Sequence, residues 1–533
     1  MSVETTPSKG QDRVLANEPS KGTLIAACLA VCLAQGALFT TNTTNEILQA
    51  SLQPVGSQLS WVSNSFLVPV VMLALTFGML GDRFGRKRLL VGGALVVVVG
   101  ETVAAAGDGI HQLWVGQAIT GVGAAALFPA SLALITAGSG SARGRAMLLS
   151  LWTAALGAGG FVALGVTRVG DVQSWNWSFS LLAVLAGVSV VVSQLLAQDS
   201  KASEGRSLDL AGQITIAVGM FALVYALVEG AAHTWSETRV VVGFIAAAVF
   251  VGLFVVVELR TENPLLPLRL FASRAFTVSS FVAVVALFGF SGTVYAVIVR
   301  VRSVQGQAAS HAGFAFTVLV AFTLLLVPVT ARLLARAGSR WPLCAGLLLM
   351  ASGYFIAASL DINDTSLTPI ILAVVPVGIG FALTIASVTN MAVDAGPARD
   401  AGTLAASTSM LRMLGFALGP VVTGAIAMRL ATSQITTDLA ASSLPAETKG
   451  AVAGVLDASG PLAVNAIPTP PVNAAHDIAF EALGSGLSQG LVVCGIATLV
   501  ACALVAVVKT GSGGPGAVAE QTAAAPEPGQ ATV

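Results

Sequence analysis

One carboxylate in this sequence lies where a charge is costly. Glu101 falls within the apolar run VVVVGETVAAA, which contains no basic residue. Charged side chains inside membrane spans are rare and are suspected of a function by default. A carboxyl held away from water can exchange a proton near neutral pH, so Glu101 is a candidate proton-coupling group. A permanently protonated side chain, or one bonded to a neighbouring helix as a structural residue, is an equally good interpretation.

Polar side chains on two other apolar runs are candidates for lining a central cavity. Asn42, Asn45 and Glu46 fall in TTNTTNEIL, near the end of the first run, and would give it a polar face. A solvated helix end is the simpler explanation of Glu46. Arg412 lies within a later run, where it could bind an acidic group or a substrate anion. A structural bond from Arg412 to a backbone carbonyl explains it equally well.

A charged loop, GMLGDRFGRKRLLVGG, separates two of the apolar runs. Asp82 stands at the end of one run, and Arg83, Arg86 and Lys87 offer cationic donors close by. A carboxylate and such donors can form charge-assisted hydrogen bonds. For the basic cluster from Arg86 to Arg88, fixing the orientation in a membrane is an equally good interpretation.

No enzyme, metal or nucleic-acid signature accompanies these residues. The sequence contains neither a phosphate-binding GxxxxGK[ST] loop nor an HExxH pair. Its 26 basic and 26 acidic residues give a net charge of zero, so no basic surface is available to neutralise phosphates. The five cysteines lie in apolar runs, where thiols behave as small hydrophobes. We therefore expect no enzyme, no cofactor, no metal site and no nucleic-acid partner.

The composition indicates an integral membrane protein. Of the 533 residues, 55% are hydrophobic and only 10% are charged, whereas ordinary soluble domains carry about 25% charged residues. Fourteen apolar runs between Gly22 and Val508 are suited to cross a bilayer, which takes about 20 residues each. Because lipid offers the backbone no hydrogen-bond partners, each crossing should be a helix. The expected fold class is all-α.

Basic residues in the short loops predict the orientation. Of the 26 Lys and Arg residues, 19 fall on the inner side if both termini are cytoplasmic, in agreement with the positive-inside rule. Tryptophan is a second indicator, because its ring prefers the membrane interface. None of the seven is expected in mid-span, and Trp152 is expected at an inner helix end. We predict a multi-pass protein of the cell membrane with both termini in the cytoplasm.

An internal repeat is visible in the loops. Gly85 pairs with Gly338 at an offset of 253, and Arg143 pairs with Arg399 at an offset of 256. Near-constant offsets are typical of transporters built from two similar halves around a midplane site. The expected organisation is a cytoplasmic tail at 1–21, a six-helix half at 22–198, a linker with two inserted helices at 199–275, a second six-helix half at 276–508 that includes an outer loop at 431–481, and a disordered cytoplasmic tail at 509–533.

These motifs resemble those of the major facilitator superfamily. The segment GMLGDRFGRKRLL matches that family's G-x-L-a-D-R-x-G-R-K-x-x-L loop at every fixed position, and LDLAGQ with VELRTENPLLPLRLF is similar to the fourteen-helix drug:proton antiporters. The resemblance extends from Leu24 to Lys509. It implies two six-helix repeats plus two inserted helices, with an inner latch that holds the halves together through Asp82 and a helix N-terminus. The implied gate residues are Gly78, Asp82, Arg83, Gly85, Arg86 and Lys87.

Three motifs of that family are altered in this chain. The arginine that the family associates with proton coupling is Gln117, which makes Gln117 a further candidate for the central cavity. The run QGALFTTNTT lacks the family's aspartate, so both members of a charge pair are missing and neither charge is left alone in lipid. The segment from Gly157 to Gly170 lacks the antiport motif's proline but keeps small residues for close helix packing.

Without a nucleotide site, the energy for transport must come from a gradient. We therefore expect a secondary active carrier of the multidrug efflux type, which exports small amphipathic or hydrophobic compounds by alternating access and is coupled to protons. Its partners would be the small-molecule substrate, protons and the lipid bilayer, and carriers of this architecture can work as monomers. The alternatives are a carrier with absent or atypical proton coupling for a dedicated lipid or metabolite, and a membrane sensor that does not transport. The intact loop around Asp82 argues against the sensor.

Overall fold

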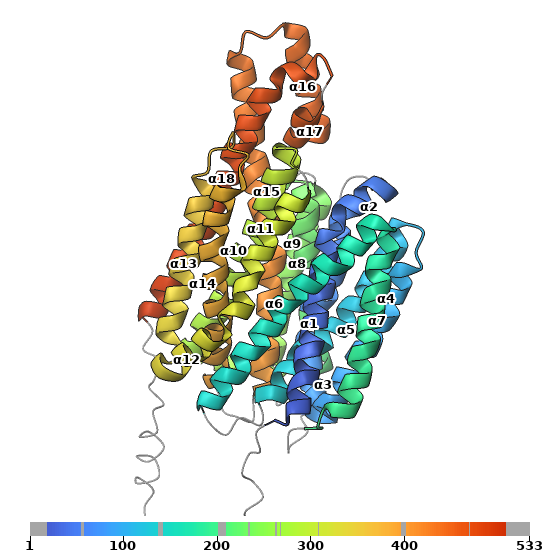
Figure 1. Ribbon diagram of the computed structural model, residues 1–533, viewed down its shortest axis with the longest axis vertical. Helices are drawn as coiled ribbons and strands as arrows, with labels where there is room; N and C mark the ends of the chain where they lie inside the picture. Colours follow the sequence, from blue (N-terminus) through green and yellow to red (C-terminus); the bar gives the residue numbers. More distant parts are fainter. Residues whose placement is uncertain are drawn as a thin grey trace, which may run out of the picture.

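Nearly all of the described chain is helical in the computed structural model (Figure 1). The residues that it describes are 19–54, 58–136, 142–200, 209–232, 235–261, 264–266, 268–307, 309–395, 401–467 and 469–507. The predicted disordered tail at 509–533 lies outside them. Within them, 13 helices are long and apolar enough to cross a membrane, or 14 spans if a bent pair counts as one. The all-α fold class is confirmed.

The described residues of the first half form six long helices and one short helix. Each long helix is apolar on almost all sides, as expected where lipid and other helices, rather than water, surround it. Their bounds are α1 (Lys21–Thr43), the short α2 (Asn45–Leu52), α3 (Gln58–Phe84), α4 (Arg86–Ala105), α5 (Ile110–Thr136), α6 (Ala142–Val172) and α7 (Trp175–Leu196).

The second half repeats this packing. Helix α10 packs on α15 as α1 packs on α6, α13 packs on α14 as α4 packs on α5, and α13 packs on α18 as α4 packs on α7. The helix contacts thus follow the repeat visible in the loops. The bounds are α10 (Arg274–Ile298) with the π-helical turn η3 (Val299–Val304), α11 (Ala309–Leu325), α12 (Val327–Ala337), α13 (Arg340–Ala358), α14 (Leu367–Asp394), α15 (Ala401–Ala441) and α18 (His476–Val507).

One expected crossing is broken in two. Helices α11 and α12 meet at an angle of 49°, and Leu326 separates them. Pro328 stands in the first turn of α12, where its missing N–H interrupts the helical hydrogen-bond ladder without cost to the new helix start. The 14 expected crossings therefore correspond to 13 helices plus this bent pair.

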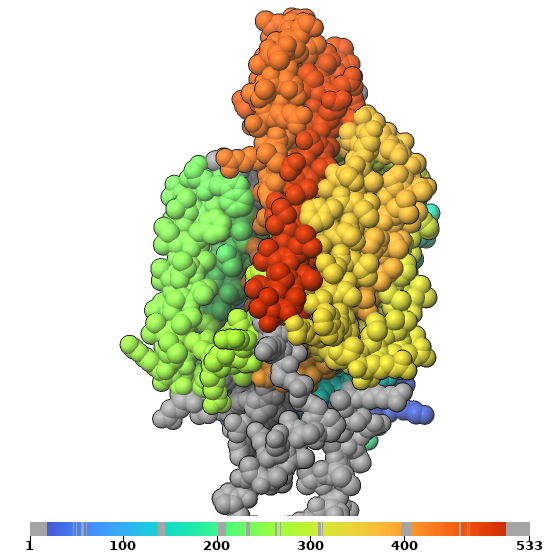
Figure 2. Space-filling model, turned by 90° about the vertical axis from the view of Figure 1, so that its left-hand side faces the viewer, coloured from blue at the N-terminus to red at the C-terminus, as the bar shows by residue number. Residues whose placement is uncertain are grey.

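The inserted pair, α8 (Leu210–Ala232) and α9 (Thr238–Arg260), stands on one side of the bundle, where Figure 2 shows it as a separate green column. The short 3-10 helix η2 (Leu268–Ala272) follows it. Helix α8 contacts both α3 and α15, and α9 packs chiefly on α8. Trp61 Nε1 donates to Glu229 Oε1 at 2.8 Å, and Arg239 pairs with the other carboxylate oxygen at 3.4 Å. The pair therefore covers the seam where α3 of the first half meets α15 of the second.

The segment expected as an outer loop, at 431–481, is mostly helical. Helix α15 has 41 residues, about 60 Å at 1.5 Å per residue, which is twice the hydrocarbon thickness of a bilayer. Its end and the start of α18 project from the bundle together with α16 (Ala446–Ser459), α17 (Pro461–Ala466) and the 3-10 turn η5 (Val472–Ala475), as Figures 1 and 2 show. We call this end of the molecule the hairpin end, and the opposite end, which carries the turn between α3 and α4, the basic end.

Asn465 ties this projection to the bundle. Its side-chain amide donates to the carbonyls of Ser303 and Val304 in η3, at 3.2 Å each. Ile435, Val464 and other apolar residues of the projection belong to one buried cluster with bundle residues such as Ala357 of α13 and Ala373 of α14. The projection is therefore a folded extension of the second half.

Candidate functional site

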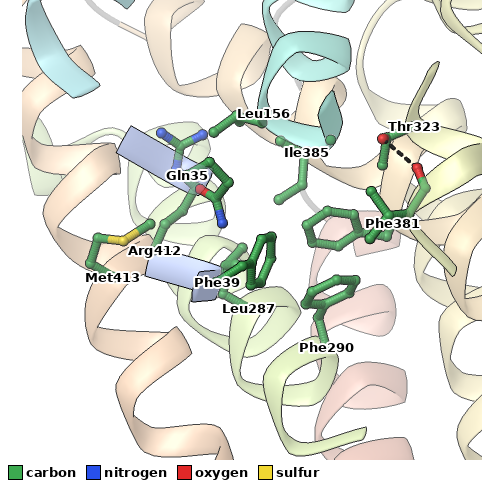
Figure 3. Close-up of a pocket in the computed structure, with 12 residues that line it drawn as sticks. Gln35, Phe39, Leu156, Leu287, Phe290, Thr323, Phe381, Ile385, Arg412 and Met413 are labelled. Carbon is green, nitrogen blue, oxygen red and sulfur yellow. Dashed lines mark hydrogen bonds between the residues drawn. The ribbon is translucent and has the colours of Figure 1, made fainter. Parts of the chain in front are cut away.

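A pocket lies between the two halves, about midway along the bundle. Helices α1 and α6 line it from the first half, and α10, α11, α14 and α15 line it from the second. Figure 3 shows Gln35, Arg412 and Met413 on one side of it and Thr323 and Phe381 on the other. The lining residues are Gln35, Phe39, Leu156, Gly157, Leu287, Phe290, Val320, Thr323, Phe381, Ile385, Arg412 and Met413.

Aromatic rings form much of the pocket wall. Phe290 of α10 and Phe381 of α14 stack with ring centroids 4.0 Å apart. Phe39 of α1 meets Phe316 of α11 edge to face at 5.1 Å and lies 5.9 Å from Phe416 of α15. Such rings offer large apolar contact surfaces to a ligand. Phe39 also joins the first half to the second.

Arg412 supplies the charge of the pocket. Its side chain is 2% exposed, and its guanidinium lies 4.9 Å from the ring centroid of Trp152 in α6, a cation–π contact. Trp152 Nε1 donates to Ser131 Oγ at 3.1 Å, which fixes the ring. Arg412 donates to Ser409 Oγ at 3.2 Å and to Thr389 Oγ1 at 3.5 Å. Of the candidates for a central cavity, Arg412 is the one that lines this pocket.

The interfacial position expected for Trp152 is wrong. The side chain is fully buried, about 15 Å along α6 from its first residue at 1.5 Å per residue. Its partners Ser131 and Arg412 explain the position, because they pair its N–H and its ring face inside the protein.

Small residues bring α6 very close to its neighbours, as the sequence predicted. A Cβ on Gly157 would lie 1.6 Å from Thr323 Oγ1 of α11, and a Cβ on Gly159 would lie 2.7 Å from the backbone nitrogen of Gly36 in α1. Separations under 3 Å cannot be accommodated without movement. Gly157 therefore marks a point where the two halves touch at the pocket.

Asp82 forms its ion pair within the first half. Its Oδ1 accepts from Arg86 Nη2 at 2.8 Å and from Arg86 Nε at 3.1 Å, and Arg86 Nη1 donates to the Ala133 carbonyl of α5 at 3.3 Å. Arg86 is buried. Its hydrogen bonds to Asp82 and Ala133 therefore give it a structural role, in addition to any effect of its charge on the orientation of the protein in the membrane. The pair joins the turn between α3 and α4 to the end of α5.

The remaining gate candidates surround this pair. Gly85 has φ +109°, a conformation that favours glycine, and a Cβ there would lie 2.7 Å from Asp199 Oδ1. The backbone N–H of Lys87 donates to the same oxygen at 3.3 Å. Gly78 is buried in α3, and the Arg83 guanidinium lies over the ring of its neighbour Phe84. The turn is thus seated on the chain segment that leads to α8.

An ion pair that the sequence analysis did not assign crosses between the halves at the basic end. Arg145 at the start of α6 lies 2.9 Å from Asp394 at the end of α14. Asn390 Nδ2 donates to Asp394 at 2.9 Å and to Ser339 Oγ at 2.7 Å. Near it, Ala146, Leu334 and Ala386 close the same gap with apolar contacts. Arg145 lies within the first repeated segment, SARGRAMLLS, and Asp394 lies three residues before the second, PARDAGTLAAS, so the repeat could have pointed to this pair.

Glu101 lies inside the first half, away from the pocket. It is fully buried on α4 and faces Thr120 and Gln117 of α5. A Cβ on Gly100 would lie 2.4 Å from Thr120 Oγ1, so the two helices touch here. The carboxyl oxygens of Glu101 and the amide of Gln117 have no hydrogen bond of normal geometry to any described residue. The structure thus brings together Glu101, the candidate for proton coupling, and Gln117, a candidate for the central cavity.

The polar residues at the end of α1, which include Asn42, lie between the pocket and the hairpin end. Asn42 accepts from Ser63 Oγ of α3 at 3.2 Å, and Thr43 lies 2.7 Å from Thr167 Oγ1 of α6. Asn45 and Glu46 belong to the short helix α2, and the side chain of Glu46 is outside the described residues. Asn42 and Asn45 are not among the residues that line the pocket of Figure 3.

A family model described as the Major Facilitator Superfamily matches residues 27–420. The chain belongs to this superfamily. Multidrug resistance protein Stp of Mycobacterium tuberculosis is 27% identical over 407 residues, 76% of this chain and 75% of that protein. The tetracenomycin C resistance and export protein of Streptomyces glaucescens is 26% identical over 518 residues, 94% of this chain and 95% of that protein. This superfamily member is therefore similar to resistance proteins over most of its length.

The fold of this superfamily member also matches solved structures. The crystal structure of the human organic anion transporter MFSD10 aligns with a TM-score of 0.59 at 13% identity, covering 91% of this chain and 99% of that one. The proton:xylose symporter XylE aligns with a TM-score of 0.57 at 13% identity, covering 90% and 94%. At this identity the likeness shows the fold alone.

Proposed function

We propose that this protein is a secondary active transporter that exports small amphipathic or hydrophobic compounds by alternating access. The observation that carries the proposal is the pocket that lies between the two halves, with aromatic walls and Arg412 as the one buried cation among its lining residues. Pockets of this kind hold small molecules, and a site between repeats can open to either side when the halves rock. The names of the relatives, multidrug resistance and export proteins, support an outward direction.

The basic end faces the cytoplasm in this proposal, in accord with the excess of Lys and Arg in its loops. Arg145 and Asp394 then close the pocket on its cytoplasmic side, and rocking of the halves breaks this contact. The pair of Asp82 with Arg86 keeps the turn between α3 and α4 rigid during that motion. The inner gate therefore has two parts. The pair of Asp82 with Arg86 stays fixed within the first half, and the pair of Arg145 with Asp394 opens between the halves.

Glu101 is the proton-coupling group in this proposal. It is a fully buried carboxyl in a span and has no basic partner among the described residues, so its protonation changes the charge at the contact of α4 with α5. Because Glu101 lies outside the pocket, proton binding and substrate binding must communicate through the packing of the first half.

Expression in a bacterial strain that lacks its own major efflux pumps tests the export function. Cells carrying the protein should accumulate less of a fluorescent amphipathic compound and tolerate higher concentrations of at least one toxic member of a substrate panel. A proton uncoupler should abolish both effects. Equal accumulation with and without the protein, for every compound tested and with the protein shown to reach the membrane, would contradict the function.

A further inference from the structure

The charge of the central pocket is one-sided. Among its lining residues Arg412 is the one ionisable side chain, and no carboxylate accompanies it. Glu101, the fully buried carboxyl on α4 of the first half, faces α5 and does not line the pocket. A cation would meet repulsion here, whereas an anion would meet a single fixed positive charge.

Within the part of the chain that the structure describes, the partners of Arg412 are all uncharged. They are the hydroxyls of Ser409 and Thr389 and the ring of Trp152, while Nε has no hydrogen-bond partner among the described residues. Burying a cation without a counter-ion is costly. A guanidinium is planar and presents its donors as a fork that fits carboxylate, sulfonate or phosphate oxygens. The geometry therefore leaves Arg412 with unused capacity for an anion.

The contact of Arg412 with Trp152 also joins the two halves. Arg412 belongs to α15 of the second half and Trp152 to α6 of the first. Motion of the halves about the pocket changes this contact, and a bound anion can replace it as the partner of the guanidinium.

Apolar rings complete the site. Phe39, Phe290 and Phe381 contribute to the wall of the same pocket as Arg412, and Figure 3 shows the three rings grouped together, with the side chains of Gln35 and Arg412 on one flank. A flat apolar body gains contact area against such rings. The site thus offers an aromatic surface and a cation within one cavity.

We propose that the preferred substrates are amphipathic organic anions, with an aromatic body held among the phenylalanine rings and an acidic group held by Arg412. This inference rests on the proposed export function and narrows its substrate class. A neutral compound of the same shape would still occupy the apolar part of the site. A cationic compound of the same shape would be excluded by Arg412.

A matched pair of probes tests this proposal in the purified full-length protein. 2-Naphthalenesulfonate and 2-naphthalenesulfonamide share one aromatic body and differ in charge, and their affinities can be measured by calorimetry in lipid nanodiscs. We expect the sulfonate to bind about 10- to 100-fold more tightly, as for a hydrogen bond to a charged group. Arg412→Gln should remove this preference and leave the sulfonamide affinity unchanged, and Arg412→Lys should restore part of the preference.

Arg300→Gln is the matched control. Arg300 is also a buried arginine, but it donates to the carbonyls of Leu360 and Asp361 near the hairpin end and does not line the central pocket. It should keep the wild-type preference. The proposal is overturned if wild-type protein binds both probes equally, if it binds neither, or if Arg412→Gln weakens both by the same factor, which is the result of a structural role on Trp152. In each of those cases, measured export of neutral compounds would still support the proposed export function, so the two proposals can fail separately.

Discussion

At the scale of single residues, Glu101 and Arg412 are the two buried charges that the sequence singled out within the spans, and the structure separates them. Arg412 lines the pocket between the halves, whereas Glu101 lies between α4 and α5 within the first half. A substrate and a proton would therefore bind at different places, and their coupling must pass through helix packing.

Replacing the carboxyl of Glu101 tests its proposed role. Glu101→Gln keeps the size of the side chain and removes its titration, so an imposed proton gradient should no longer drive substrate accumulation in proteoliposomes. Movement of substrate down its own gradient should persist. Glu447→Gln, an exposed glutamate on α16, is the control and should behave as wild type. Undiminished proton-driven accumulation by Glu101→Gln would eliminate Glu101 as the coupling group.

Some residues of the pocket and the spans could be predicted from the sequence and others could not, for physical reasons. A charge within an apolar run is conspicuous, so Glu101 and Arg412 were found. Phe290 and Phe381 were not, because an apolar side chain on an apolar helix can face lipid, another helix or a cavity with the same pattern. Gln35 carried a usable signal, since it is a polar residue inside a span.

At the scale of helices, the close approach of α6 to α11 is the feature that the pocket depends on. Gly157 meets Thr323, whose hydroxyl is held by a 2.6 Å hydrogen bond to the Val320 carbonyl. A Cβ at 157 would also lie 2.7 Å from Thr323 Cβ, so Thr323 or the helices must shift to accommodate it, and overpacking of this kind costs about 1–3 kcal/mol. The contact therefore favours the conformation in which the halves meet at the pocket.

An exchange of side chains across this contact tests the argument. Gly157→Ala should slow transport by about 5- to 150-fold, the equivalent of the overpacking cost, and adding Thr323→Gly should restore much of the rate. Gly165→Ala is the control on the same helix, because a Cβ there meets nothing within 4 Å. Transport rates in proteoliposomes measure all three. A Gly157→Ala protein as fast as wild type would show that this contact does not limit the cycle.

The sequence predicted the helices that cross the membrane, because lipid requires long apolar runs there. It did not predict the helices of the segment that projects beyond the membrane-crossing bundle. The crossings followed from runs of apolar residues, including the bent pair at Pro328. The helical character of the projecting segment did not, because turn-rich residues such as IPTPP in 467–471 suggested a loop. Its short helices are stabilised by an apolar cluster around Ile435 and Val464 that continues into the bundle, which composition alone does not show.

At the scale of the whole molecule, the contact between Arg145 and Asp394 reports which side of the pocket is closed. The pair is partly exposed, with side chains 29% and 45% accessible, so it contributes on the order of 0.2–1 kcal/mol. Breaking it should shift the equilibrium toward opening at the basic end by no more than about fivefold. The hairpin end has its own fixed contacts, through Asn465.

A charge exchange tests this contact. Asp394→Arg should increase the population open at the basic end, and the added change Arg145→Asp should reverse much of the effect by restoring an ion pair. Electron paramagnetic resonance between spin labels at Met147 and Arg336, in a protein without its native cysteines, measures the distance distribution. Identical distributions in the wild type, the single variant and the double variant would show that the pair does not bias the two conformations.

Uphill transport tests the central claim most directly. Purified protein in liposomes with an acidic lumen, and with no nucleotide present, should concentrate an externally added substrate above its outside concentration, because molecules inserted with the basic end outward take it up as protons leave. Collapse of the gradient should release the substrate to the outside level. Equilibration without accumulation, under every pH gradient and for every compound that binds the pocket, would contradict a proton-driven exporter.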